Sequence, residues 1–313
     1  MICSRKSRTA PIRRIFSVSA TTFSQIEWRF SRIAGCTTHS PECFKIVLKN
    51  KTAIITGASS GLGRQIALDL ARQEMNLVLA ARDGNALEEL ARQIGERGAT
   101  ALVQPTDVTD ESQCRTLITR TIERFKRLDY LVLNAGLSMW VRFDQVTDLN
   151  IFRRLMDVNY IGVVNCIHPA LPYLKGVCGT IVTISSAQAL IGISKHTGYS
   201  ATKHALRGFL EALEVEMGDQ IRFLTVMPGW VSGTKLRANA LRADGTPLGT
   251  SKPRHTHEAV SLEECSTRIV RAMQEGASAV YIPRKIRAIP WLKLLVPGWL
   301  RAKIKRSMAQ QEK

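Results

Sequence analysis

The sequence lacks the usual marks of a metalloprotein and of a membrane-spanning protein. Its seven cysteines are scattered along the chain, at positions 3, 36, 43, 114, 166, 178 and 265. They form no C-x-x-C pair and no Cys/His ligand spacing, so no metal site is predicted, and the odd, scattered set suits a reducing compartment. Cys166 and Cys178 fit core or helix positions better than a chemical role. No stretch reaches about 20 apolar residues, so no spanning helix is expected.

Acidic residues are scarce, with 26 Asp and Glu against 44 Lys and Arg and a formal charge of +18. The excess lies at the two ends, because residues 1–50 carry a net +7 and residues 282–313 a net +8, which leaves +3 on residues 51–281. A nucleic-acid partner is therefore not indicated for the folded part of the chain. The 45% hydrophobic content suffices for one large α/β domain of about 230–250 residues with extensions.

From residue 52 onward, strand and helix patterns alternate. The expected strands are 52–56, 76–81, 101–105, 129–133, 179–184, 221–226 and 279–282. The expected helices are 61–74, 86–96, 110–126, 148–173, 197–217 and 261–275, the last with a capping box at Ser261 and Glu264. Such alternation implies a parallel sheet covered on both faces. The predicted fold class is α/β, a Rossmann-type doubly wound parallel sheet of about seven strands in a single domain.

A glycine-rich turn follows the first expected strand, where residues 51–63 read KTAIITGASSGLG. Glycine permits a sharp turn and lets backbone N–H groups approach a pyrophosphate at a helix N-terminus. The alternative is an ordinary strand-to-helix turn. Because a helix pattern and a second strand at 76–81 complete a βαβ unit, the segment is interpreted as a dinucleotide-binding turn.

Tyr199 and Lys203 form the second chemical signal. A spacing of four places both side chains on one helix face, about 5–6 Å apart at Cβ. An ammonium group about 4 Å from a phenol favours the phenolate by roughly 4 kcal/mol at an effective dielectric of about 20, or about three pKa units. This estimate predicts that Lys203 brings the pKa of Tyr199 close to neutral pH and makes the pair an acid/base.

Five motifs in this order resemble the short-chain dehydrogenase/reductase superfamily over roughly residues 48–283. They are Thr56-Gly57-x3-Gly61-x-Gly63, Asn134-Ala135-Gly136, Asn159 in MDVNY, Ser186 thirteen residues before Tyr199, and Pro228-Gly229 after the sixth strand. Ser185, next to Ser186, does not have the family's spacing. The resemblance implies an oxidoreductase whose catalytic residues are Asn159, Ser186, Tyr199 and Lys203.

The resemblance also implies their roles. Tyr199 would exchange a proton with the substrate oxygen while hydride passes to or from a nicotinamide. Lys203 would hold the nicotinamide ribose, and the Ser186 hydroxyl would bond the same substrate oxygen. Asn159 would hold a water linking Lys203 to solvent, the alternative being a helix asparagine bonded locally to backbone.

The cofactor contacts implied by the resemblance extend over the whole domain. They are Gly57, Ser59, Ser60, Gly61, Leu62, Gly63, Arg82, Asp107, Val108, Asn134, Ala135, Gly136, Tyr199, Lys203, Pro228, Gly229, Val231 and Thr234. Asp107 would bond the adenine amino group or cap the following helix, a role for which Asp110 competes. Thr234 departs from the family pattern by one position, because Gly233 stands where threonine is expected.

The end of the second strand predicts NADP rather than NAD. An NAD-binding domain places an acidic residue there for the ribose 2′-hydroxyl, and this chain has Ala81 followed by Arg82. A guanidinium suits a 2′-phosphate because it is planar and always charged. Asp83 complicates the assignment, and a surface arginine ending the strand is the alternative.

Residues 230–258 are predicted to form the substrate loop, with Leu236, Leu241 and Leu248 as candidate pocket walls. This loop and the proline-containing tail resemble the dehydrogenase/reductase member-7-like branch, which implies a lipophilic carbonyl or alcohol as substrate. The resemblance also implies a homodimer or homotetramer formed through the long helices that carry Asn159 and Tyr199. The alternative function is a non-catalytic NADP-binding or membrane-associated scaffold of the same fold.

Residues 284–313 form a basic amphipathic tail in which Trp291 and Trp299 alternate with cations. This pattern over 286–306 suits a membrane surface, where apolar groups enter and charges stay with the headgroups. Pro290 and Pro297 break the tail into short pieces, so it should lie on a bilayer and not cross it. The alternative is a tail packed on its own domain or on a second subunit.

Residues 1–47 precede the expected domain. Residues 1–45 are rich in Arg, Ser and Thr and poor in acids, which fits either organelle targeting or a disordered extension, including an overlong assignment of the start. The extension is favoured, because similar enzymes usually begin a few residues before the first strand, here near Val47. The expected location is cytoplasmic, with membrane association through the tail.

Overall fold

The computed structural model describes residues 45–249 and 259–312, with side chains up to residue 306. All elements below belong to the unit Phe44–Lys313. The interpretation of residues 1–45 as targeting segment or extension, apart from Lys45, falls outside the described residues, as does the part of the predicted substrate loop at 250–258.

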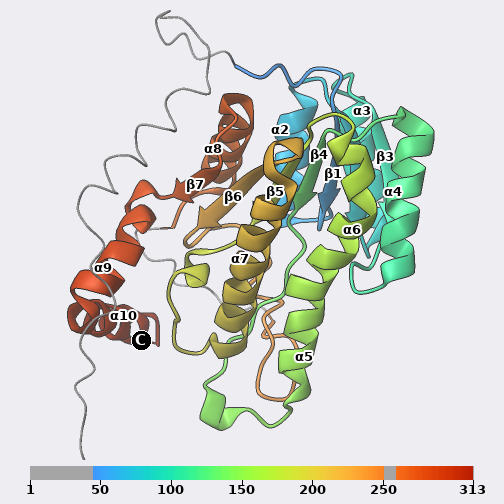
Figure 1. The fold of residues 1–313 in the computed structure, drawn as a ribbon. Helices are drawn as coiled ribbons and strands as arrows, with labels where there is room; N and C mark the ends of the chain where they lie inside the picture. The colour runs from blue at the N-terminus through green and yellow to red at the C-terminus, as the bar shows by residue number, and fades with distance from the viewer. Residues whose placement is uncertain (1–44, 250–258, 313) are drawn as a thin grey trace, which may run out of the picture. The chain divides into compact units, whose positions relative to one another are not determined.

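The centre of the fold is a parallel sheet of seven strands in the order β3-β2-β1-β4-β5-β6-β7 (Figure 1). The strands are β1 (Thr52–Thr56), β2 (Asn76–Ala81), β3 (Ala101–Pro105), β4 (Tyr130–Leu133), β5 (Thr180–Ile184), β6 (Arg222–Pro228) and β7 (Ala279–Ile282). The chain changes direction across the sheet between β1 and β4, which pair in parallel. Ligands bind at such a switch point in open α/β sheets. The Rossmann-type prediction is confirmed.

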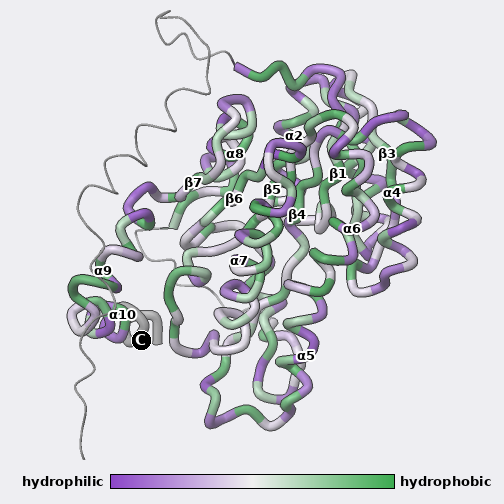
Figure 2. Tube along the Cα trace, viewed as in Figure 1, coloured by the Kyte–Doolittle hydropathy of each residue, from purple (hydrophilic) through white to green (hydrophobic). Residues whose placement is uncertain are grey.

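Three helices cover each face of the sheet. α2 (Gly61–Ala71), α3 (Gly84–Gly95) and α8 (Leu262–Glu275) pack on one face, and α4 (Glu111–Phe125), α6 (Gly162–Lys175) and α7 (Thr197–Met217) on the other. Neighbouring residues of a strand serve opposite faces, so Ile55 joins the first core and Ile54 the second. In Figure 2 the hydrophobic colour follows the strands, whereas the outer turns of α3 and α4 are hydrophilic.

The single helix expected over 148–173 is wrong in detail. The structure has α5 (Asn150–Met156), then a π-helical turn at Asp157–Ile161, then α6. Gly162 follows the turn, and a Cβ there would lie 2.7 Å from Val108 Cγ2, so the helix passes close to the loop after β3. A π turn inserts a residue without breaking the helix, which periodicity cannot reveal, and such turns are frequent at functional sites.

The tail folds as two helices, α9 (Ile289–Leu295) and α10 (Pro297–Glu312), and in Figure 1 they lie on the β7 side of the sheet, away from α3 and α4. Pro290 lies in the first turn of α9, and Pro297 begins α10. Backbone N–H groups in a first turn have no helical acceptor, so a proline there removes no helical hydrogen bond. Pro297 therefore starts a helix of 16 residues and does not limit the tail to short pieces. Within the described residues, no helix is long and apolar enough to cross a bilayer.

Candidate active site

A cavity of about 800 Å³ opens at the carboxyl ends of the strands. The segments after β1, β2, β3, β4, β5 and β6 and the first turns of α7 all contribute to its wall. The parallel sheet brings these ends to one edge, so residues far apart in sequence share one site.

The turn after β1 has the backbone expected of a phosphate-binding turn. Gly57 and Gly61 have φ of +66° and +55°, a region that other residues rarely adopt. Gly63 lies one turn into α2, and a Cβ there would come within 2.4 Å of both Asn134 Nδ2 and Gly57 O. Gly63 thus allows the helix to approach the strands closely.

Asn134 ties the turn after β1 to the end of β4. Its Nδ2 donates to Thr56 O at 3.0 Å and to Gly57 O at 3.2 Å, and its backbone N–H donates to Thr56 Oγ1 at 3.0 Å. The N–H of Ala135 donates to the same Thr56 Oγ1 at 3.1 Å. We call these bonds the Thr56–Asn134 latch. The latch joins the end of β1 to the segment that follows β4, the two sides of the switch point in the sheet.

The structure brings nearly all predicted site residues to the cavity wall. The lining includes Gly57, Ser59, Ser60, Gly61, Leu62, Arg82, Asp107, Val108, Asn134, Ala135, Gly136, Ser186, Tyr199, Lys203, Pro228, Gly229, Val231 and Thr234. Gly63 and Asn159 do not line the cavity. Gly63 was expected to contact the cofactor directly, and the geometry does not support that contact; Asn159 was expected to act through a water.

Asn159 is a positioning residue, held in the π turn and fully buried. Its Oδ1 accepts from Leu137 N–H at 2.8 Å, and its Nδ2 donates to Leu137 O at 2.8 Å and to Thr202 Oγ1 at 3.0 Å. Both amide hydrogens are therefore occupied by protein groups. The side chain thus fastens the segment after β4 to α7, one residue before Lys203. The water that Asn159 would hold beside Lys203 stays a prediction.

Tyr199, Ser186 and Lys203 lie together, all buried. The Ser186 and Tyr199 side chains are hydrogen-bonded, whereas Ser185 takes no such part. Lys203 Nζ lies 5.6 Å from the centre of the Tyr199 ring and donates to Ile184 O at 3.2 Å. The choice of Ser186 over Ser185 thus agrees with the geometry.

The expected lowering of the Tyr199 pKa is wrong for this structure. Burial raises the pKa of Tyr199 to about 12, opposed by the Ser186 hydrogen bond, and burial lowers the pKa of Lys203 to about 8. The attraction between the two groups favours both charged forms, but burial removes water from both of them, and this loss has the larger effect on each pKa. At neutral pH Tyr199 is a neutral phenol and Lys203 is mostly a cation.

At the ends of β2 and β3 the acidic residues have local partners. Asp83 caps α3 by accepting from Ala86 N–H at 3.1 Å, and Asp110 caps α4 by accepting from Ser112 N–H at 2.8 Å. Asp107 is therefore not the cap of α4; its carboxylate accepts from Thr109 N–H at 3.0 Å and lines the cavity. Arg82 is exposed at the cavity edge.

The segment after β6 closes the other side of the cavity. Thr234 lies against the glycine turn, since a Cβ on Gly61 would meet Thr234 Cα at 3.7 Å. The contact of Thr234 with a nicotinamide stays a prediction. Leu236 and Leu241 line the cavity as expected, but Leu248 does not. Leu248 N–H donates to Ala240 O at 2.8 Å, in a turn beside the cavity.

The lining residues that were not named individually from the sequence include Trp140 after β4, His196 three residues before Tyr199, and Trp230 and Arg237 after β6. The three rings form one cluster, with the Trp140 and His196 centroids 5.0 Å apart and those of His196 and Trp230 6.0 Å apart. Trp230 and Arg237 fall within the predicted substrate loop, whereas no local pattern marks Trp140 or His196 as lining residues.

This fold and site define a nucleotide-binding α/β protein with a phenol, hydroxyl and ammonium beside the nucleotide turn. Residues 51–244 match the family model described as short chain dehydrogenase. The chain belongs to the short-chain dehydrogenase/reductase family.

Several known proteins are similar to the chain over most of its length. An 11-beta-hydroxysteroid dehydrogenase of Pinus massoniana is 33% identical over 81% of this chain and 72% of that protein. The 11-beta-hydroxysteroid dehydrogenase-like 2 of Arabidopsis thaliana is 32% identical over 86% and 84%. These names do not test the resemblance to the member-7-like branch, which stays a prediction.

Two solved structures share the fold. The alcohol dehydrogenase of the archaeon Thermococcus sibiricus, complexed with 5-hydroxy-NADP, is 28% identical with a TM-score of 0.65 and covers 74% of this chain and 96% of that one. A short chain dehydrogenase/reductase of Burkholderia phymatum in complex with NAD has a TM-score of 0.70 at 23% identity, covering 79% and 94%. The second comparison concerns the fold alone.

Burial of Lys203 gives a testable pH dependence. The pKa of Lys203 is about 8 in the folded chain, against an ordinary value of 10.5. Between these two pH values the unfolded chain binds more protons than the folded chain. Burial of Lys203 therefore lowers the free energy of unfolding by its full amount below pH 8, and this loss is relieved as the pH rises to 10.5. Replacing Lys203 with Met should raise the free energy of unfolding at pH 7 by about 1–3 kcal/mol, after loss of the bond to Ile184 O. Urea unfolding at pH 7 and 10 measures this; a gain that does not shrink at pH 10 would contradict the assignment.

Proposed function

We propose that the protein is an NADP(H)-dependent carbonyl reductase or alcohol dehydrogenase acting on a lipophilic substrate. The observation that carries the proposal is the buried group of Tyr199, Ser186 and Lys203 on the wall of a cavity that also holds the glycine turn. Membership of the family supports the reaction class.

The residues fit the cofactor that this reaction requires. The glycine turn with its positive φ angles would receive the pyrophosphate, and Asp107 and Val108 would border the adenine. Pro228, Gly229 and Thr234 would border the nicotinamide, together with Lys203. When bound, the nicotinamide supplies or accepts the hydride.

Tyr199 and Ser186 would handle the proton and the charge on the substrate oxygen. A phenol with a pKa of about 12 is protonated at neutral pH, which is the state that donates a proton to a carbonyl oxygen. Ser186 bonds Tyr199 and can donate to the same oxygen, where charge develops in the transition state. The cation of Lys203 would stabilise the phenolate that remains. Asn159 keeps this helix turn in place through Leu137 and Thr202.

Removal of the Tyr199 hydroxyl tests the reaction. Tyr199→Phe keeps the ring that packs with Met139 and Leu241, so the fold and cofactor affinity should persist while kcat falls by at least about 100-fold. NADPH oxidation at 340 nm with a panel of lipophilic ketones and aldehydes measures turnover, and a fluorescence titration measures NADPH binding. Turnover retained in the variant would remove Tyr199 from the mechanism.

The alternative, a non-catalytic NADP-binding or membrane-associated scaffold, predicts a different result with the same panel of ketones and aldehydes. A binding-only protein would hold NADPH without turnover on any substrate. The burial of Lys203 argues against it, because a buried cation lowers stability and a scaffold gains nothing from one.

Arg82 supports NADP over NAD within this proposal. Its side chain is exposed at the cavity edge, at the end of β2, and Asp83 is engaged as the cap of α3. A guanidinium in this position can pair with a 2′-phosphate in two parallel hydrogen bonds. The Thermococcus sibiricus structure, complexed with 5-hydroxy-NADP, is consistent with this choice.

Substitution of Arg82 should shift the cofactor preference. Arg82→Ala should raise the KM for NADPH by about 10–100-fold and leave the KM for NADH nearly unchanged, because only NADPH carries the 2′-phosphate. Arg97→Ala removes the same charge from an exposed position outside the cavity and serves as the control. An unchanged ratio of the two KM values in Arg82→Ala would contradict the role.

We further propose that the tail helices attach the protein to a membrane surface. One side of the tail packs on the domain: Ile286 joins Leu190 and Met227, Leu300 is buried, and Lys293 Nζ donates to Leu190 O at 3.3 Å. These contacts support packing of this side of the tail on its own domain.

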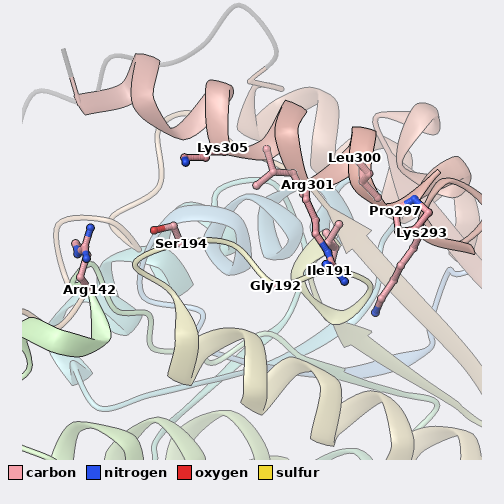
Figure 3. Close-up of a pocket in the computed structure, with 10 residues that line it drawn as sticks. Arg142, Ile191, Gly192, Ser194, Lys293, Pro297, Leu300, Arg301 and Lys305 are labelled. Atoms are coloured by element: carbon pink, nitrogen blue, oxygen red, sulfur yellow. The ribbon is translucent and has the colours of Figure 1, made fainter.

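The other side of the tail is apolar and exposed. Trp291 is 66% exposed, Leu294 72% and Leu295 71%, and Trp299 continues the same patch. Figure 3 shows the adjoining cavity of about 630 Å³, where Lys293 and Arg301 reach towards the segment 191–194. Aromatic and aliphatic groups beside cations are the arrangement that an anionic lipid surface binds.

The segment 190–195 separates the two cavities. Ile191, Gly192 and Ser194 line the tail cavity, whereas Ile193 lines the cavity of Tyr199. The cavity beside the tail, and not the exposed patch itself, therefore lies one chain thickness from the substrate site.

Surface substitutions test the membrane contact without removing the buried Ile286 and Leu300. The triple change of Trp291, Leu294 and Leu295 to Ser should reduce co-sedimentation with phosphatidylserine-containing liposomes by at least about 10-fold, because each side chain contributes apolar burial. The exposed Val215 on α7, changed to Ser, is the control. Equal sedimentation of wild type and triple variant would eliminate the proposal.

A further inference from the structure

The substrate end of the active-site cavity is lined by one imidazole and one guanidinium, those of His196 and Arg237, that the proposed reaction does not use. His196 lies next to the reacting group, with its ring centroid 6.1 Å from that of Tyr199. Trp140 stands between His196 and Arg237, with the His196 ring 5.0 Å from its centroid and the Arg237 guanidinium carbon 4.1 Å from it. All four residues line the cavity.

His196 carries an N–H that no group of the described residues accepts. Gln188 accepts from Ser200 Oγ at 2.7 Å, which orients its amide so that Nε2 faces His196 Nδ1 at 3.4 Å. The donor on Gln188 makes Nδ1 an acceptor and places the imidazole proton on Nε2. Nε2 is buried without a partner among the described residues, and burial lowers the pKa of His196 to about 4, so the ring is neutral.

Arg237 carries a second such donor. Its Nε is buried without a partner among the described residues, and burial lowers its pKa. Three carboxylates line the cavity, those of Asp83, Asp107 and Asp157, and among the described residues none of them forms an ion pair with Arg237. Asp83 caps α3, and Asp107 accepts from Thr109 N–H. The guanidinium is therefore neutralised by no carboxylate of the described chain.

Unpaired buried donors destabilise a fold, and a desolvated guanidinium does so more than a neutral group. Both unpaired atoms belong to residues that line one cavity, although Arg237 as a whole is only partly buried. An acceptor on a ligand in this cavity would satisfy them, and sites of this kind reject analogues without that acceptor. The cofactor does not supply it at the 2′-phosphate, because Arg82 follows β2 and Arg237 follows β6, with β1, β4 and β5 between them.

We propose that Arg237 and His196 form an oxyanion subsite, and that the substrate is a lipophilic ketone or alcohol bearing an acidic group, a carboxylate or a phosphate. This inference rests on the proposed reductase function and names its substrate class. Trp140 and Trp230, whose ring centroids are 6.5 Å apart, form an aromatic wall beside the subsite. The acidic group is held at Arg237 while the carbonyl reaches Tyr199 across the Trp140 and His196 rings.

Binding of simple amphiphiles tests the subsite without turnover. Calorimetric titration of the full chain, with and without NADP⁺, should show decanoate or decyl phosphate binding about 10–100-fold more tightly than decanol, because an ionic hydrogen bond is added. Whichever of the two anions binds more tightly identifies the acidic group of the substrate as a carboxylate or a phosphate. Arg237→Gln should abolish the preference, and Arg237→Lys should keep part of it.

Two controls separate the subsite from a structural role. Arg242→Gln removes the same charge from the same segment outside the cavity and should leave the preference intact. His196→Phe keeps the ring contacts with Trp140 and should weaken anion binding by about 5–10-fold, as expected for one neutral donor. Equal binding of anion and alcohol by wild type, or equal losses in Arg237→Gln and Arg242→Gln, would overturn the proposal.

Turnover then distinguishes this inference from the proposed function. Oxo-acids should be reduced with a higher kcat/KM than their methyl esters, and Arg237→Gln should remove the difference through KM with kcat nearly unchanged. Turnover of acids and esters at equal kcat/KM would leave the reductase standing and reject the subsite. Anion binding that depends on Arg237, with no turnover on any ketone, would support the subsite and reject the reductase.

Discussion

The site depends on the Thr56–Asn134 latch, which closes the switch point of the sheet. The amide of Asn134 spans two consecutive carbonyls of the turn after β1, and the Thr56 hydroxyl accepts from two backbone N–H groups after β4. Gly63 must lack a Cβ for this amide to fit between strand and helix. The turn after β1 and the segment after β4 are thus fixed by each other's side chains, which holds the backbone of the glycine turn in a defined shape.

The second constraint is the burial of ionisable groups. Tyr199, Lys203 and His196 are all buried at one end of the cavity, and for each of them burial disfavours the charged form. The surrounding helix is locked through Asn159, whose amide joins the segment after β4 to α7 by three hydrogen bonds. A site of this kind stores an electrostatic cost in the free protein, which substrate and cofactor can offset when they bind.

Most of the fold and much of the site followed from local pattern. The glycine turn, the alternation of strands and helices and the lining role of Ser186, Tyr199 and Asn134 depend on residues near one another or on family motifs. The pKa of Tyr199, the packing role of Asn159 and the π turn depend on burial and on contacts between distant segments, which spacing does not contain. Trp140, His196 and Arg237 were missed for the same reason: only the folded chain places them around one cavity. The predicted oligomer and location stay predictions.

The thin wall at 190–195 has a kinetic consequence. If the tail seats the protein on lipid as proposed, the cavity between the tail and this wall would give compounds of the bilayer a short path to the substrate site, so the rate would follow their mole fraction in the lipid and not their aqueous concentration. Dilution of the substrate by inert lipid would slow such an enzyme even at constant total substrate. The same seating suits an amphiphilic molecule whose acidic group stays at the interface while its chain remains in the hydrocarbon.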